Sequence, residues 1–217
     1  MSATKVRTVV VTLTALGSAL PATNPPYSGW PVERLTANLE ARLAESPEDV
    51  GVLYDLGLSV DSCKALDELI APQLTVPFDL DGDAVDELWP WIAPDAGWLV
   101  WDPQRKGEIT SGRQLFGTAS GWLFFEDGYR VHDALDDDRS GELRGLELAG
   151  IAVWFDRDTD GISDRGEVIP VEELGIVALA TRATEIVGRS PAHPGGLELA
   201  DGRVLPTYDW VLEAVSD

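Results

Sequence analysis

The chain has 217 residues, of which 38 are acidic and 16 are basic, so its formal net charge is -22 and its isoelectric point is near 4.2. This charge makes nucleic acid and anionic membrane surfaces poor partners, whereas cations are favoured ones. Hydrophobic residues make up 44% of the sequence and eight residues are tryptophan, which is enough to fill the core of one domain or of two small ones.

The first 22 residues have two interpretations. Basic residues precede the apolar run 9–20, as in a bacterial export signal, and no other stretch is long enough to span a membrane. The alternation of Val9, Val11 and Leu13 with threonines also fits an edge strand. A signal predicts a secreted or cell-surface protein, whereas a strand leaves a cytoplasmic location open.

Residues 23–75 are predicted to be a proline-rich linker followed by helices. Leucines at four-residue spacing from Leu35 indicate a first helix, and Ser46-Pro47 is a typical start of a second one. A third, short helix is expected to carry Leu66, Leu69 and Ile70. We expect this helical segment to pack on the rest of the chain.

Residues 156–167 have the spacing of a calcium-binding loop. Side-chain oxygens at positions 1, 3 and 5 converge on one ion, position 7 offers its carbonyl, position 9 acts through water and a glutamate at position 12 closes the site. Glycine at position 6 allows the left-handed backbone of the turn. The predicted ligands are Asp156, Asp158, Asp160, the carbonyl of Ile162, Asp164 and Glu167.

Residues 136–147 repeat this pattern, with glycine at position 6, leucine at position 8 and glutamate at position 12. An acidic, solvated turn is the alternative, but such a turn needs neither that glycine nor that glutamate. The predicted ligands are Asp136, Asp138, Ser140, the carbonyl of Glu142 and Glu147.

Two weaker copies precede these loops. The first begins at Asp79 and has Ala84 where glycine is expected, which costs about 1–2 kcal/mol in a left-handed conformation. The second, residues 102–113, has Lys106 at position 5 and Arg113 at position 12; because cations there oppose metal binding, we predict a metal-free structural copy. The ligands predicted for the first, short loop are Asp79, Asp81, Asp83, the carbonyl of Val85 and Glu87.

The spacing of the loops predicts how they are arranged. The loops at 102 and 136 are far enough apart for two paired helix-loop-helix units, in which Ile109 and Leu143 would meet in a short bridge. The loops at 136 and 156 are too close for two full helices, so we expect a short helix over 143–149 and an extended segment over 151–155. Residues 176–181 are a further strand candidate.

The expected fold class is α+β: EF-hand-like helix-loop-helix calcium loops with short helices, an N-terminal helical segment and a C-terminal β-hairpin with its turn at Asp201-Gly202. The expected domains are 1–22 as a signal peptide or edge strand, 23–75 as the helical segment, 76–170 as the EF-hand-like calcium module, and 171–217 as a β-rich extension packed on that module.

The order of motifs from Phe78 to Trp210 resembles the calcium-loop modules of bacterial secreted and surface proteins. The motifs are FDLDGD, GWLVWD, GEITSGRQLFG, the two acidic loops, ELGI and DGRVLPTYDW. The resemblance implies ion binding of the EF-hand or dockerin type and no enzymatic activity.

The predicted function is structural calcium binding, in which two or three Ca²⁺ ions stabilise an exported or surface protein. A calcium sensor that recruits a protein partner is the first alternative, and a metal-dependent hydrolase is a weaker one. Because Met1 is the only methionine and target grooves are usually rich in methionine, the structural role is preferred. Catalysis is not expected, since Cys63 is alone and neither His132 nor His193 stands in a catalytic pattern.

Overall fold

The computed structural model describes residues 8–14, 65–123 and 125–215. All of them belong to one compact unit, Met1–Ser18 with Cys63–Asp217. The helices predicted from Leu35 and from Ser46-Pro47 lie outside the described residues.

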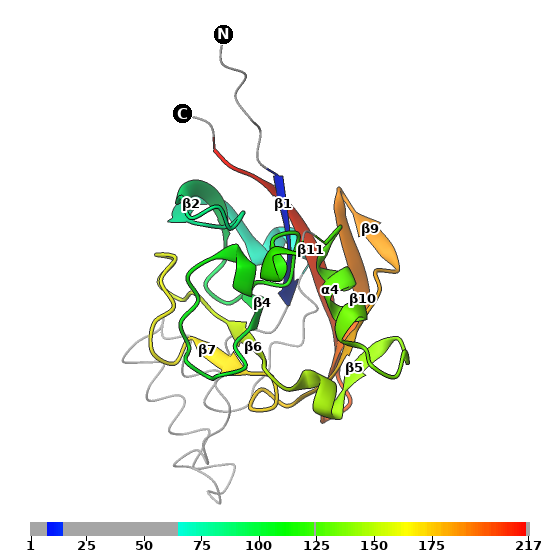
Figure 1. Ribbon diagram of the computed structural model, residues 1–217. Coiled ribbons are helices and arrows are strands. Elements are labelled where there is room, and N and C mark those ends of the chain that lie inside the picture. Colours follow the sequence, from blue (N-terminus) through cyan, green and yellow to red (C-terminus); the bar gives the residue numbers. More distant parts are fainter. Residues whose placement is uncertain (1–7, 15–64, 124, 216–217) are drawn as a thin grey trace, which may run out of the picture. The chain divides into compact units, whose positions relative to one another are not determined.

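Strands dominate this unit, and nine of the described ones form a single antiparallel sheet (Figure 1). Their order is β5-β8-β10-β11-β1-β4-β6-β7, and β9 pairs with β10. The strands are β1 Thr8–Thr14, β4 Gly97–Trp101, β5 Glu142–Arg144, β6 Ile151–Trp154, β7 Val168–Pro170, β8 Ile176–Ala180, β9 Glu185–Val187, β10 Ser190–Leu199 and β11 Val204–Glu213.

A second sheet consists of the antiparallel pair β2, Ile70–Phe78, and β3, Glu87–Ile92. The described residues include two α-helices, α3 at Leu66–Leu69 and α4 at Gly128–Leu135. Short 3-10 turns are η1 at Gly112–Gln114, η2 at Ser120–Trp122 and η3 at Gly145–Leu148. Among the described residues, no helix is long and apolar enough to cross a membrane.

The centre of the main sheet is buried on both faces. Along β4, Trp98 and Val100 belong to one core cluster and Leu99 to another, because successive side chains of a strand point to opposite faces. The same alternation separates Trp154 from Val153 along β6. The first cluster contains all the tryptophans that are buried among the described residues and includes residues of the β2-β3 pair; the second contains mainly aliphatic side chains. Core packing is therefore the observed role of Trp89, Trp91, Trp98 and Trp154, all fully buried.

The expected α+β class with helix-loop-helix units is wrong, because the described residues are mainly β-strands. Three of the four acidic loops begin after a strand: Asp79 follows β2, Asp102 follows β4 and Asp156 comes shortly after β6. Only the loop at Asp136 follows a helix, α4. The loop pattern is local, so it does not require the flanking helices of an EF-hand.

Several local expectations came out differently. The short helix expected over 143–149 is strand β5 followed by the 3-10 turn η3. The extended segment 151–155 and the strand at 176–181 are confirmed as β6 and β8. The C-terminal hairpin is confirmed as β10 and β11, although a four-residue connection, 200–203, replaces the two-residue turn.

The expected boundary near residue 170 does not separate two units. Strand β8 pairs with β5, and β11 is connected to β4 through β1, so segments from 76–170 and 171–217 alternate within one sheet. Residues 8–14, left open as an export signal or an edge strand, form β1, which has partners on both sides and is therefore not an edge. The predicted helical segment 23–75 overlaps β2, because Ile70 already begins that strand.

Candidate metal centres

Four loops share one backbone conformation. The first carboxylate of each loop accepts hydrogen bonds from amides four or five residues later, as Asp136 does from Ser140 (3.1 Å) and Gly141 (2.9 Å). Positions 4 and 6 have positive φ in every loop, and these residues are Gly82 and Ala84, Arg105 and Gly107, Arg139 and Gly141, and Thr159 and Gly161. These four loops therefore have the same backbone turn, although their charged residues differ.

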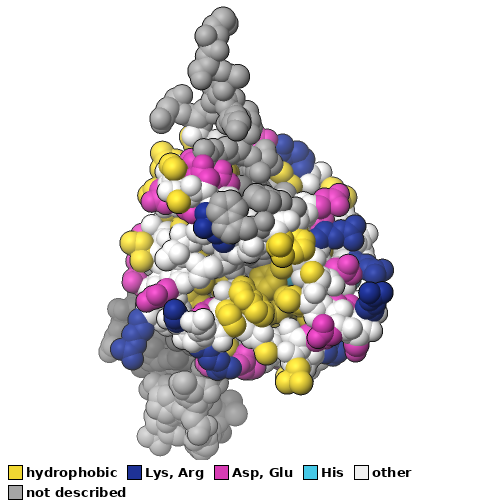
Figure 2. Space-filling view, viewed as in Figure 1, with side chains coloured by type: hydrophobic (Ala, Val, Ile, Leu, Met, Phe, Trp, Pro, Cys, Tyr) yellow, Lys and Arg dark blue, Asp and Glu magenta, His cyan; other side chains and the backbone are white. Residues whose placement is uncertain are grey.

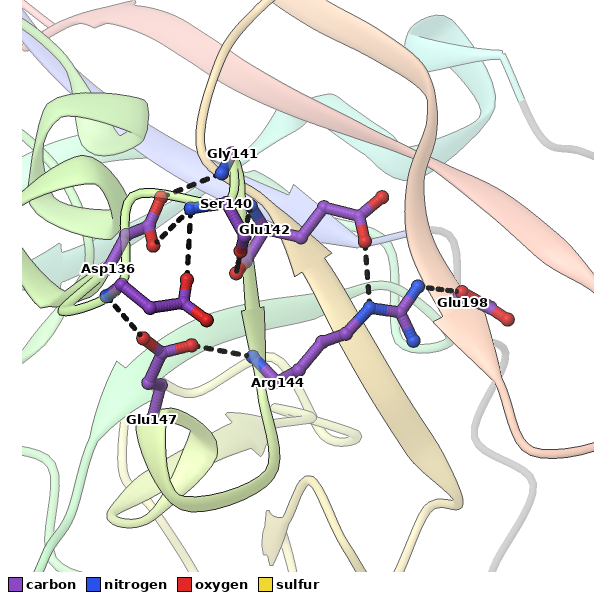
Figure 3. Close-up of polar contacts among 8 residues, drawn as sticks. Asp136, Ser140, Gly141, Glu142, Arg144, Glu147 and Glu198 are labelled. Atoms are coloured by element: carbon purple, nitrogen blue, oxygen red, sulfur yellow. Dashed lines mark hydrogen bonds and ion pairs between the residues drawn. The ribbon is translucent and has the colours of Figure 1, made fainter.

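In the loop at 136, Asp136, Asp138 and Glu147 bring carboxylate oxygens within 4.8 Å of one another. Two oxygens that contact one calcium ion at about 2.4 Å lie at most about 4.8 Å apart, so this spacing is compatible with one shared ion. Glu147 is held in place by the amides of Asp137 (2.8 Å) and Arg144 (3.0 Å), as Figure 3 shows for Arg144.

In the loop at 156, Asp156, Asp158 and Glu167 form a group with the same spacing. Glu167 again accepts hydrogen bonds from positions 2 and 9 of its loop, the amides of Arg157 (2.8 Å) and Asp164 (3.1 Å). Asp156 is fully buried and Glu167 is 5% exposed. This group is the most enclosed of the three, because two of its carboxylates are buried.

Burial raises the pKa of Asp156 to about 6. The negative charge of Glu167 adds to this, whereas hydrogen bonds from Gly161, from Trp91 and from Asp160 favour the ionised form. The indole Nε1 of Trp91, on β3, donates to Asp156 Oδ2 at 2.5 Å. Two carboxylates enclosed together repel each other, and a cation between them would remove that repulsion.

In the loop at 79, Asp79, Asp81 and Asp83 form the third group. Burial raises the pKa of Asp79 above its usual value, while hydrogen bonding to Ala84 and the charge of Arg113 lower it. Ala84 has φ 70°, the left-handed conformation expected where glycine is missing. Asp83 is exposed, so this group is more open than the one at 156.

The loop at 102, predicted to be a metal-free copy, contributes no residue to the three groups. Asp102 accepts hydrogen bonds from the amides of Lys106 (3.0 Å) and Gly107 (2.8 Å), which hold the turn. Arg113, in place of the closing glutamate, donates from Nε to the carbonyl of Gly82 in the neighbouring loop (2.7 Å). Its charge therefore lies against the loop at 79.

The three groups consist of carboxylates only, and the predicted carboxylate ligands Asp160, Asp164 and Glu87 are not among them. Ser140 donates to the carbonyl of Glu142 (2.9 Å), so these two predicted ligands contact each other (Figure 3). The carboxylates of Asp160 and Asp83 accept from the amides of Ile162 (2.8 Å) and Val85 (3.0 Å), which stabilises the turns. Asp164 is exposed, and Glu87, expected to close the first loop, begins β3 instead.

The expected pairing of the loops at 102 and 136 is wrong. Leu143 pairs with Leu179 of β8. Ile109 lies against Ser163, whose Oγ accepts from the amide of Ile109 (2.8 Å). The loop at 102 thus meets the loop at 156 at position 8 of both. Sequence spacing did not reveal this, because β5, which follows the loop at 136, pairs with β8 at the opposite end of the sheet from β6 and β7.

Sequence reasoning also missed an apolar pocket of about 360 Å³ next to α4. Figure 2 shows hydrophobic side chains gathered in a hollow near the middle of this face. The pocket is lined by residues that include Trp101, Leu115, Phe116, Val131 and Leu135, and Leu135 directly precedes Asp136. Hydrophobic residues scattered between η1 and α4 were the only signal of it in the sequence.

The fold and these sites define a β-sheet domain that carries acidic turns at the ends of strands β2 and β6 and of helix α4. Residues 66–213 match the family model of the SPM domain, and the chain belongs to this family. The match includes every described helix and strand except β1. The "Iron-regulated protein FrpA" of Neisseria meningitidis serogroup C is 30% identical over 148 residues, which are 63% of this chain and 13% of that protein.

Proposed function

We propose that this chain is a calcium-binding domain in which the bound ions stabilise the fold. The observation that supports this best is the convergence of three groups of carboxylates, each with its ligand atoms within 4.8 Å, in turns of one shared conformation. The groups are Asp79, Asp81 and Asp83; Asp136, Asp138 and Glu147; and Asp156, Asp158 and Glu167.

The chemistry of the groups favours calcium over other metals. All the gathered ligand atoms are carboxylate oxygens, which suit hard cations, and neither histidine nor cysteine takes part in the groups. Magnesium demands near-octahedral geometry and usually keeps several waters, whereas a turn that offers many oxygens at flexible distances suits calcium. The chain would therefore bind up to three Ca²⁺ ions, with no catalytic step assigned to them.

A stabilising role is favoured over signalling because the loops are held by strands. The loop at 136 leads directly into β5 and the loop at 156 connects β6 with β7, so neither of these loops lies between two long helices that could swing open. This role suits an exported or surface protein, where calcium is abundant enough to fill weak sites.

The apolar pocket beside α4 supports a calcium sensor as the second candidate, because Leu135 joins the pocket to the loop at 136. In that case calcium would change the shape of the pocket and a protein partner would bind there. Calcium-dependent binding of a hydrophobic dye would favour the sensor, and a rise in melting temperature without dye binding would favour the stabilising domain.

Calorimetric titration of the full chain with calcium tests the proposal. We expect two or three ions per chain, and one ion fewer after Asp158→Asn, which removes a charge from one group. Glu108→Gln, at an exposed position of the metal-free loop, is the matched control and should leave the stoichiometry unchanged. Absence of heat with the wild-type chain, at calcium concentrations up to the millimolar range, would reject calcium binding.

A further inference from the structure

We infer that the loops at 79 and 156 are a coupled pair of calcium sites, joined by the metal-free loop 102–113, and that the loop at 136 binds its ion independently of them. This inference rests on the proposed function, since coupling requires that both loops bind an ion. The loop 102–113, which lacks the ligands of a calcium site, would then serve to connect the two sites.

One end of the metal-free loop is attached to the loop at 79. The amide of Gly112 donates to the carbonyl of Asp79 (2.7 Å), and Arg113 donates to the carbonyl of Gly82. A Cβ atom on Gly112 would lie 1.8 Å from the carbonyl oxygen of Leu80. Only glycine fits this close approach, so the two loops are in direct backbone contact.

The middle of the metal-free loop is attached to the loop at 156. The Oγ of Ser163 lies 2.8 Å from the amide nitrogen and 3.5 Å from the carbonyl oxygen of Ile109, so one hydroxyl serves both backbone groups. Ile109 is 2% exposed. Ser163 is flanked by Ile162 and Asp164, so movement of the loop at 156 reaches Ile109 through one residue.

A second route joins the same two sites through the aromatic core. Phe78, which directly precedes Asp79, packs against Trp91 and Trp154 with ring centroids 5.6 Å apart in both pairs. Trp91 donates its hydrogen bond to Asp156. The positions of Asp79 and Asp156 are therefore linked by packed side chains as well as by the loop.

The loop at 136 makes contacts of a different kind. Gly141 accepts from the amide of Thr181 (3.1 Å), and Leu143 pairs with Leu179. Arg144 forms ion pairs with Glu142 and with Glu198 of β10 (Figure 3). These contacts tie this loop to the end of the sheet formed by β5, β8 and β10, and β6 and β7 form the opposite end.

The expected sign of the coupling is positive. An ion at the loop at 79 orders Asp79 and Gly82, and through them Gly112 and Arg113. Because the same loop holds Ser163, the loop at 156 is then partly ordered before its own ion binds, and the entropy lost on binding is smaller.

Terbium titration of the full chain can test the inference. Trp91 and Trp154 contact the carboxylates of Asp156 and Glu167, so energy transfer from tryptophan to terbium reports binding at the loop at 156. The part of the terbium emission that Asp158→Asn removes is assigned to this loop. Asp81→Asn should weaken terbium binding at the loop at 156 about tenfold, within the usual range of coupling between sites. The matched change Asp138→Asn, in the loop at 136, should alter it by less than about twofold.

The link itself is tested with Ser163→Ala, which removes the contact with Ile109. In that background the effect of Asp81→Asn should fall to about threefold or less, because one of the two routes is lost. Ser190→Ala is the matched control: Ser190 is buried and accepts from the amide of Val211 (3.2 Å), away from the loops, and should leave the tenfold effect intact. Near-ultraviolet circular dichroism verifies that each variant is folded.

The outcomes separate the two proposals. No sensitised emission from the wild-type chain would reject both. The coupling would be overturned if the wild-type chain gives emission but Asp81→Asn does not change the affinity of the loop at 156 for terbium, or changes it no more than Asp138→Asn does. Calcium binding would then still stand. An undiminished effect in the Ser163→Ala background would show that the metal-free loop is not the link and would also overturn the inference.

Discussion

Buried carboxylates set the loop at 156 apart from the other two candidate sites. Asp156 and Glu167 are both buried, whereas Glu147 is half-buried and Asp83 is exposed. Placing two ionised carboxylates in a poorly solvated space is unfavourable without a cation. Among the three groups, this one should gain most from a bound ion.

Glu167→Gln should weaken calcium binding at the loop at 156 at least about tenfold, or about 1.4 kcal/mol, because it removes a charge from the closing ligand. Oε1 and Oε2 of Glu167 each accept one of the hydrogen bonds from the amides of Arg157 and Asp164, so the single amide oxygen of glutamine keeps only one of them and the turn is weakened as well. Site-resolved terbium titration measures the loss. An equal loss after Glu108→Gln, on the exposed surface of the metal-free loop, would contradict this assignment.

His132 is the residue whose protonation should matter most for stability. It is fully buried, its Nδ1 lies 2.8 Å from the carbonyl oxygen of Ala180, and its Nε2 has no hydrogen-bond partner among the described residues. Burial lowers its pKa from 6.5 to about 4, against the smaller effects of the hydrogen bond and of Asp127. The folded chain therefore resists binding a proton that the unfolded chain accepts.

This pKa difference predicts a loss of stability in acid. The contribution of neutral His132 to the free energy of unfolding is complete above pH 6.5. It is lost as the pH falls from 6.5 towards 4, because in this range the unfolded chain binds a proton at His132 that the folded chain does not. Between pH 7.5 and pH 5 the calcium-free chain should lose about 2 kcal/mol from this residue alone. Denaturant unfolding of the wild type and of His132→Asn at several pH values measures this loss. The variant should be less stable than the wild type at pH 7.5. If its stability falls as steeply with pH as that of the wild type, His132 is not the cause.

At the scale of elements, the turns are independent of what precedes them. The same pattern of positive φ at positions 4 and 6 follows strands β2, β4 and β6 as well as helix α4. The side chains and amides of each loop supply its internal hydrogen bonds, so the flanking elements only need to fix its ends. The loops differ in what they contact, and those contacts are set by the sheet.

Gly112→Ala should destabilise the fold by about 2 kcal/mol or more, since its Cβ would overlap the carbonyl of Leu80 and force the two loops apart. Gly195→Ala is the matched control, because its Cβ would meet only Val204 at ordinary distances of 3.8 and 3.9 Å, and it should cost less than about 0.5 kcal/mol. Chemical denaturation in saturating calcium measures both. Equal stability of the two variants would show that the contact between the loops at 79 and 102 is loose.

At the scale of the whole molecule, a formal charge of -22 opposes compaction, and part of it is concentrated in the three acidic turns. These turns connect β2 with β3, α4 with β5, and β6 with β7. Bound divalent ions would offset the local repulsion where the chain must turn. The fold and its ions should therefore depend on each other.

Removal of calcium should lower the melting temperature and expand the molecule. With calcium in about 100-fold excess over its dissociation constant, each independent site adds about 2.7 kcal/mol to the free energy of unfolding. Thermal melting and small-angle scattering in chelator and in calcium measure the two effects, and sodium chloride at matched ionic strength separates specific binding from screening. A melting temperature equal in all three buffers would contradict the stabilising role.

Local features of this protein could be read from its residues. The position of each loop and the left-handed conformation of Ala84 follow from the glycine and carboxylate positions within twelve residues. Strands β6 and β8 and the hairpin at Asp201-Gly202 were also predicted, because apolar β-formers bounded by turn residues specify them nearby in the chain.

The partners of these segments depended on the tertiary structure. The expected helix-loop-helix class failed because the loop pattern carries no information about the elements around it, and Leu143 proved to face β8 rather than Ile109. The sequence alone determined where the chain turns and gathers charge, since those interactions span a few residues. Only the packing of the two sheets decided which turns touch, how deeply Asp156 is buried and how Trp91 reaches it, because these contacts join residues far apart in the chain.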